Sequence, residues 1–198
     1  MSKIEVDTIE PQSGTTVTLG ASGDTITVPS GATFNINGAG ITSNGITEAD
    51  QWRLTADLTG TNAVISSNLE RVDTAGQGTL GTGMTESSGV FTFPSTGIWF
   101  VIANGISANA SVADNMELHI EVTTNNSTYT VIALSADSSG GTGSDQTASL
   151  ACNSIIDVTD TANVKVRFKT ASFLAASILL GTTTNNQTAF TFIRLGDT

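Results

Sequence analysis

Cysteine and histidine are nearly absent from the chain, which has one of each among its 198 residues. With a single cysteine, no disulfide can form within the chain. A nucleophile and its base could be assembled only across subunits, and the sequence has neither Cys/His metal spacing nor a phosphate-binding glycine motif. We therefore predict that the protein is not an enzyme and binds no cofactor. Cys152, in Leu150-Ala151-Cys152, is predicted to be a small buried hydrophobe.

Positive charge is scarce too: 7 Lys and Arg residues against 18 Asp and Glu residues give a net charge of −11. Neutralising phosphates requires clustered cations, so nucleic acid is not an expected partner. No stretch approaches the roughly 20 apolar residues of a membrane-spanning helix, and residues 1–11 lack the apolar core of a signal peptide. We expect the protein to be synthesised in a cytoplasm and not to insert into a membrane.

Helical periodicity is also missing, because no window of about ten residues combines it with capping residues. The chain instead has Thr, Ser, Asn and Gly around short apolar segments, a composition typical of strands and tight turns. Met116, Leu118, Ile120 and Val122 alternate with polar residues and predict a half-buried strand. About ten short segments of this kind, separated by turns, predict an all-β sandwich.

Residues 11–47 form an imperfect repeat with one short strand and one glycine turn in each unit. A unit buries only one apolar pair, too little to offset an ordering entropy of about 1–2 kcal/mol per residue. Three chains wound together would cover one another's apolar rows, which predicts a trimeric, β-helix-like shaft. A disordered Gly/Thr linker fits the composition but not the paired spacing. The predicted apolar pairs are Val17 with Leu19, Ile26 with Val28, and Phe34 with Ile36.

The repeat stops near residues 48–51, and Trp52 opens a pattern of longer strands. We place a junction there and predict a separate head over residues 52–198. Residues 1–10 alternate charged and apolar side chains as a strand would, but they are too few to fold alone. This leader is predicted to dock on another protein or on sister chains.

The head is organised around residues 88–105, which predict a hairpin with a Pro-Ser-Thr-Gly turn. Its second strand, residues 98–103, is apolar at every position, and such a strand needs a cover on both faces. One cover is the core of the chain, and the other is predicted to be another subunit. The candidate core or trimer-interface residues of this strand are Ile98, Trp99, Phe100 and Val101.

Two groups of polar residues are candidate cation sites. Glu117, His119 and Glu121 share one face of the strand over residues 116–122, and near a threefold axis they could bind a cation. The alternative is a histidine that gains two carboxylate neighbours on a solvated face. The segment from Asp137 to Asp145 offers oxygen ligands at calcium-like spacing but lacks a bidentate Glu, and a loop tip is the alternative. We predict no metal site.

Lys165, Arg167 and Lys169 hold three of the seven cations on one face of a predicted strand. In an acidic protein such a stripe could meet an anionic surface polysaccharide or an acidic neighbour. Ordinary solubility and protection of a sheet edge explain it equally well. Asp137 and Asp145 complete the candidate surface-binding residues.

The order of these features resembles the trimeric jelly-roll heads of the tumour necrosis factor and complement type. The resemblance covers roughly residues 52–198 and implies a jelly-roll head whose inner sheet packs about a threefold axis. It makes Trp99, Phe100, Phe190 and Phe192 candidates for axis or core contacts. The chain differs from the animal members in lacking a signal peptide and disulfides, which argues against a cytokine or complement role. The residues that carry the resemblance are 88–94, 97–100, 148–150, Asp160 with 164–166, and 189–193.

The leader and the Gly/Thr repeats resemble fibre proteins of marine tailed bacteriophages. This resemblance implies a homotrimer located in the virion, with residues 1–10 docked on other virion proteins and the head presented to a host-surface polysaccharide or protein. A capsid decoration or stabilising spike without receptor binding is the first alternative. A bacterial adhesin-like module is the second.

Overall fold

The computed structural model describes residues 9–14, 17–18, 20–21, 23–25, 27, 29–32, 45–109, 114–139 and 146–198. The chain divides into two compact units, Met1–Thr42 and Ser43–Thr198. The described residues are strands, turns and irregular segments without any helix, as the composition predicts. In that part of the chain, no helix is long and apolar enough to cross a membrane.

The described part of the first unit contains two turns at the glycines of the predicted repeat. The N–H of Asp24 donates to the carbonyl of Ala21 at 3.0 Å, and the N–H of Ala32 donates to that of Pro29 at 3.1 Å. No described residue of this unit lies in a strand, and Val17 is exposed. The β-shaft therefore stays a prediction. Its other apolar positions, Leu19, Ile26, Val28, Phe34 and Ile36, lie outside the described residues, as does most of the leader.

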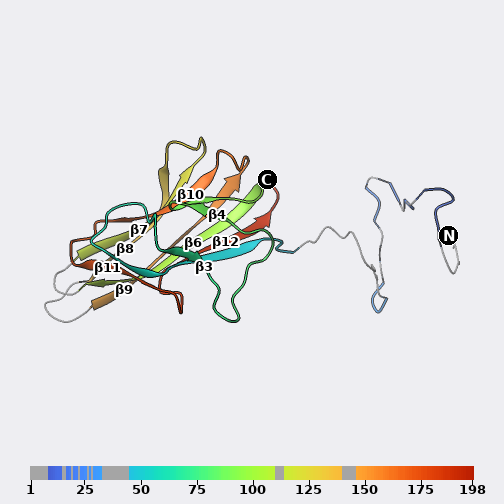
Figure 1. Ribbon diagram of the computed structural model, residues 1–198. Coiled ribbons are helices and arrows are strands. Elements are labelled where there is room, and N and C mark those ends of the chain that lie inside the picture. The colour runs from blue at the N-terminus through green and yellow to red at the C-terminus, as the bar shows by residue number, and fades with distance from the viewer. Residues whose placement is uncertain are drawn as a thin grey trace. The chain divides into compact units, whose positions relative to one another are not determined.

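The second unit contains two antiparallel sheets (Figure 1). Sheet A has the order β2-β11-β6-β12-β1-β3, with β9 on the other edge of β6, and sheet B has the order β4-β5-β10-β7-β8. The strands are β1 (Ala49–Leu54), β2 (Ala56–Thr59), β3 (Leu69–Arg71), β4 (Thr85–Ser87), β5 (Val90–Thr92), β6 (Gly97–Asn109), β7 (Asp114–Thr123), β8 (Thr130–Ser139), β9 (Gln146–Val158), β10 (Lys165–Ala171), β11 (Ser177–Thr182) and β12 (Ala189–Gly196).

The predicted hairpin over residues 88–105 is wrong, because its two strands belong to different sheets. β5 pairs with β4 and β10 in sheet B, whereas β6 pairs with β9, β11 and β12 in sheet A. The physical reason is aromatic packing between the sheets. Phe93 and Trp99 are both buried, with ring centroids 5.2 Å apart, so the segment between them crosses from one sheet to the other.

Aromatic side chains fill the space between the sheets. Phe91 of sheet B lies edge-on to Phe168 and to Trp52, with centroids 5.5 Å apart in both cases. Phe168 stacks on Phe190 of sheet A at 3.9 Å, and Phe192 lies beside them. These contacts join β1, β5, β10 and β12 across the sandwich. They stabilise the fold by more than their apolar burial alone would.

The predicted strand over residues 116–122 is confirmed as part of β7, and Met116, Leu118 and Ile120 point into the core. Cys152 lies in the same core, where its thiol donates to the carbonyl of Leu118. Burial raises the pKa of this thiol to about 11, so the thiolate is disfavoured. Cys152 is the small buried hydrophobe that its sequence context predicts.

Candidate functional site

β6 alternates between the core and the outside, although its sequence does not alternate in hydrophobicity. Trp99, Val101 and Ala103 are buried between the sheets. Ile98 and Phe100 point to the opposite side, here called the outward face of sheet A, and are half-buried. Within one chain, the outward row of this strand therefore has no complete cover.

The outward row of β6 continues across the neighbouring strands. Phe100 pairs in register with Ile155 of β9 on one side and with Ile193 of β12 on the other, and Ile193 pairs with Ala49 of β1. Residues in register share a face of the sheet, so these four side chains form one apolar row. Ile155 is 63% exposed. The other three residues of the row are half-buried, so the row is a candidate interaction surface.

A second row on the same face begins apolar and becomes polar. Ile102 pairs with Asn153 of β9 and with Thr191 of β12, which in turn pairs with Gln51 of β1. The Gln51 side chain donates from Nε2 to the Thr191 hydroxyl at 2.7 Å and accepts from Asn186 Nδ2 at 2.6 Å. The apolar area thus lies over β9, β6 and β12, and it ends at β1.

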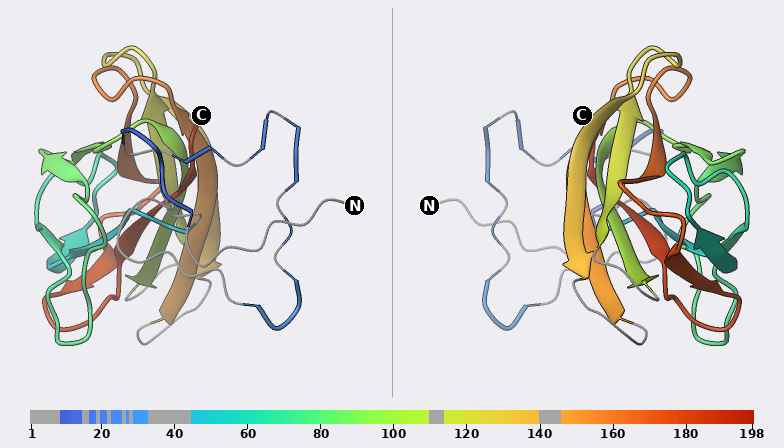
Figure 2. Two further views of the ribbon diagram at one scale, coloured as in Figure 1. Left: turned by 90° about the vertical axis from the view of Figure 1, so that its right-hand side faces the viewer. Right: turned by 90° about the vertical axis from the view of Figure 1, so that its left-hand side faces the viewer.

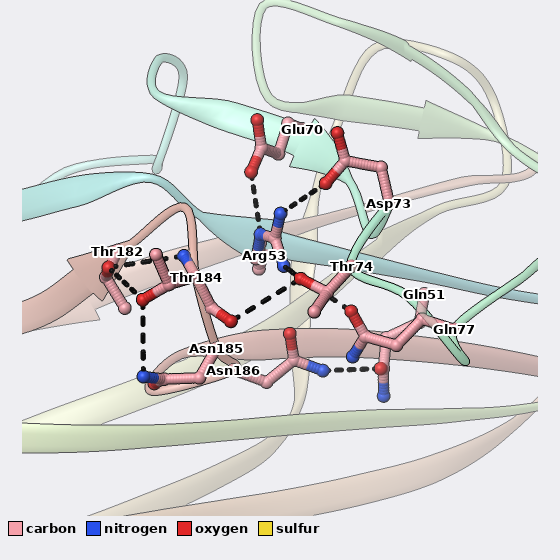
Figure 3. Close-up of polar contacts among 10 residues, drawn as sticks. All are labelled: Gln51, Arg53, Glu70, Asp73, Thr74, Gln77, Thr182, Thr184, Asn185 and Asn186. Carbon is pink, nitrogen blue, oxygen red and sulfur yellow. Dashed lines mark hydrogen bonds and ion pairs between the residues drawn. The ribbon is translucent and has the colours of Figure 1, made fainter.

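A polar cluster around Arg53 borders the outward face of sheet A on its β1 side (Figure 3). Arg53 is 1% exposed, and its guanidinium contacts Glu70 Oε1 at 2.6 Å and Asp73 Oδ1 at 2.5 Å. It also donates to the hydroxyl of Thr74 at 2.8 Å and to Gln77 Oε1 at 3.4 Å. The buried charge of Arg53 is tolerated because it has this many partners. Its hydrogen bonds hold the segment over residues 73–77 against β1.

A second exposed apolar surface lies along the edges of the two sheets. β8 is the edge strand of sheet B and β9 an edge strand of sheet A, and the two lie side by side (Figure 2). Val131, Ile132 and Leu134 of β8 are exposed, and so is Ile155 of β9. Neither strand contains Lys or Pro, residues that commonly protect an exposed edge.

The structure does not bring together Glu117, His119 and Glu121, the residues of the candidate cation site. Glu117 Oε2 lies 2.7 Å from His119 Nε2, whereas Glu121 contacts Arg167 at 2.6 Å and Lys169 at 3.9 Å. The hydrogen bonds from His119 and then Ser172 hold the pKa of Glu117 below its ordinary value. Among the described residues, no three or more His, Cys, Asp or Glu side chains are grouped to hold a metal ion.

The cationic stripe lies on β10, and two of its residues already have partners. The Arg167 guanidinium stacks over Tyr129, 3.8 Å from the ring centroid, while it pairs with Glu121. Because Glu121 also attracts Lys169, the charge available to an outside anion is smaller than the sequence implies. Lys165 is half-buried at the start of the same strand. Asp137 is half-buried in β8, and Asp145 lies outside the described residues.

The predicted interface residues separate into two sets. Trp99, Val101, Phe190 and Phe192 belong to the core of one chain, and Ile98 and Phe100 lie on the outward face. Sequence reasoning missed Ile155, Ile193 and the apolar residues of β8. The adjacent pair Ile155-Ile156 does indicate an outward apolar residue in the sequence. Neighbours in a strand point to opposite faces, so one of the two must point outward.

No family model matches the chain, and no curated protein matches it. Among solved structures, Eiger TNF from S. frugiperda matches with a TM-score of 0.58 and 12% identity, over 78% of this chain and 96% of that chain. The fold is a TNF-like jelly roll. Murine APRIL structures at pH 8.5 and pH 5.0 match with TM-scores of 0.53, at 11% and 13% identity, over 75% of this chain and 98% of theirs. At this level of identity the likeness establishes the fold alone, and it confirms the all-β jelly-roll head.

Proposed function

We propose that the protein is a non-enzymatic structural subunit that forms a homotrimer through the outward face of sheet A. The observation that carries the proposal is the row of Ile155, Phe100 and Ile193, which one chain leaves partly open to water. Full burial of an Ile or Phe side chain stabilises by about 1.5–3 kcal/mol relative to exposure. Covering this row and its neighbours therefore offers on the order of several kcal/mol per chain.

A second copy of the chain is the best-supported occupant of this face. The same chain carries another exposed apolar surface along β8 and β9, which includes Ile132 and Leu134. When an edge of one copy packs on the face of the next, a rotation of one third of a turn between copies closes a ring of three. The N-terminal repeats independently need several chains to cover their apolar pairs, and three chains satisfy both requirements.

We further infer that the trimer is a tailed-phage fibre located in the virion. Residues 1–10 dock on other virion proteins, residues 11–47 form the β-shaft, and the jelly-roll head engages a host-surface polysaccharide or protein. Support comes from the repeat that precedes the head, from the resemblance of the leader to phage fibres, and from the acidic composition with a single cysteine.

Native mass measurement of the full chain tests the assembly, with a trimer expected and a monomer contradicting the proposal. Deletion of residues 52–198 in the phage tests the role of the head. Loss of adsorption with intact particles supports host attachment. Fragile particles with normal adsorption would instead indicate a capsid decoration.

A further inference from the structure

On the outward face of sheet B, which points away from the core, one side chain crosses an intervening strand. Arg167 of β10 stacks on Tyr129, which immediately precedes β8, with its guanidinium carbon 3.8 Å from the ring centroid. β7 lies between β10 and β8 in the sheet, so the two side chains meet over β7. Glu121 of β7 accepts from Arg167 Nε at 2.6 Å and is itself 5% exposed. The carboxylate and the guanidinium together fix the position of the Tyr129 ring.

Lys165 shares this face and has no carboxylate of its own. It precedes Arg167 by two residues in β10, so both side chains point to the same side of the sheet. Among the Lys and Arg residues that the structure describes, Lys165 is the one that forms no ion pair. The face is net positive in a chain of net charge −11, because Lys165, Arg167 and Lys169 stand against Glu117 and Glu121.

Hydroxyl and amide groups lie beside the Tyr129 ring. The exposed turn over residues 124–128, which directly precedes Tyr129, contains only Thr, Asn and Ser. An aromatic surface with a few fixed polar groups is the usual composition of a small-ligand site. A sugar acid matches these groups, because its C–H face is apolar, its hydroxyls form hydrogen bonds and its carboxylate needs a cation.

We propose that Tyr129 and Lys165 bind a carboxylated saccharide on the outward face of sheet B. This inference rests on the host attachment proposed above and names its ligand class. Lys165 pairs with the carboxylate of the sugar. Tyr129 is half-buried and offers the part of its ring that Arg167 leaves uncovered to the apolar face of the sugar. Arg167 is already paired with Glu121, so it positions the ring and does not neutralise the ligand.

The first test uses the single tyrosine as a reporter. Incorporating 3-fluorotyrosine into the full chain gives one fluorine NMR signal, because Tyr129 is the only tyrosine. Titration with trigalacturonate is expected to shift this signal with a Kd of about 1 mM at low salt, and more weakly at ~0.5 M NaCl, where charges are screened. Maltotriose, a neutral saccharide of the same length, is expected to leave the signal in place. A signal that ignores trigalacturonate, or that moves equally with both saccharides, overturns the proposal.

The second test compares K165Q with K169Q, which each remove one positive charge from the same face of β10. K165Q is expected to raise the Kd for trigalacturonate about tenfold. K169Q is the matched control and is expected to change the Kd less than about twofold, because Lys169 already lies 3.9 Å from Glu121. Equal effects of the two variants would show a general attraction to positive charge and overturn the site.

The proposed site lies within one chain, so the titration does not depend on assembly. A wild-type monomer that binds trigalacturonate overturns the homotrimer and leaves this inference standing. A wild-type trimer that does not bind it overturns this inference alone.

Discussion

Asp50 and Arg71 form a two-point ion pair, in which Arg71 Nε lies 3.0 Å from Asp50 Oδ1 and Nη2 lies 3.1 Å from Oδ2. The Asp50 side chain is fully buried. Its carboxylate also accepts from the Met84 N–H at 2.7 Å and from Trp52 Nε1 at 2.9 Å. The pair therefore ties β1 to β3 and to the segment that leads into β4, on the core side of sheet A, where Asp50 pairs in register with the buried Phe192.

Replacing Asp50 with alanine should lower the free energy of unfolding by about 1–3 kcal/mol, the usual effect of leaving buried donors without their acceptor, since Arg71 itself is 40% exposed. The loss arises because Arg71 and the Met84 N–H keep their polarity but lose their acceptor. Urea unfolding at a fixed protein concentration measures it. D197A is the control, since Asp197 also pairs with an arginine but is 92% exposed just after β12, and little change is expected there. Equal effects of both variants would contradict this account.

Phe100→Asp should convert the trimer to a folded monomer. The substitution places a charge in the centre of the Ile155–Phe100–Ile193 row, where a second chain would have to desolvate it. Sedimentation measures the mass, and circular dichroism checks that the sandwich is intact. L174D makes the same kind of change at an exposed apolar residue of the β10–β11 loop and should remain trimeric. An F100D trimer would remove the main support for the proposed interface.

The strands of the sandwich can be predicted where apolar and polar side chains alternate, although His119 and Glu121 on the polar side of β7 are buried as well. The alternation from Met116 to Val122 predicts β7 for this reason. The partition of β5 and β6 between two sheets cannot be predicted from the turn between them. It depends on how Phe93 and Trp99 pack in the core, and this packing exists only after both sheets have formed.

The candidate site is predictable only in part, for a similar reason. A strand that is apolar at every position identifies Phe100 as a residue that needs a second cover. The sequence does not show that Ile155 and Ile193 lie beside it, because this depends on the strand order β9-β6-β12. It also does not show that Arg53 is buried, because its partners Asp73 and Thr74 are in a loop that folds back over β1.

Stability should fall on the acid side partly through Glu117, whose pKa in the folded protein is lowered by His119 first and by Ser172 second. A lowered pKa means that the folded state favours the carboxylate. The stabilisation is therefore fully present above the ordinary value of 4.5 and is lost as the pH falls through the lower folded value. Glu117→Gln should flatten the decline of the urea midpoint over this range. E10Q, at an exposed residue of the first unit, reports the effect of net charge alone. An E117Q profile that parallels the wild type would refute this assignment.

Gly97 should resist substitution, because the chain enters β6 there with a φ of +139° in close contact with the end of β12. A Cβ at this position would lie 2.5 Å from the carbonyl oxygen of Gly196, so the backbone of one strand would have to move. Gly97→Ala should destabilise by about 1–3 kcal/mol, the usual effect of a strained backbone. Gly196 provides the matched control, since a Cβ there meets no atom within 4 Å. Urea unfolding of G97A and G196A at the same protein concentration separates the two, and equal stabilities would show that the start of β6 can shift to accept the methyl group.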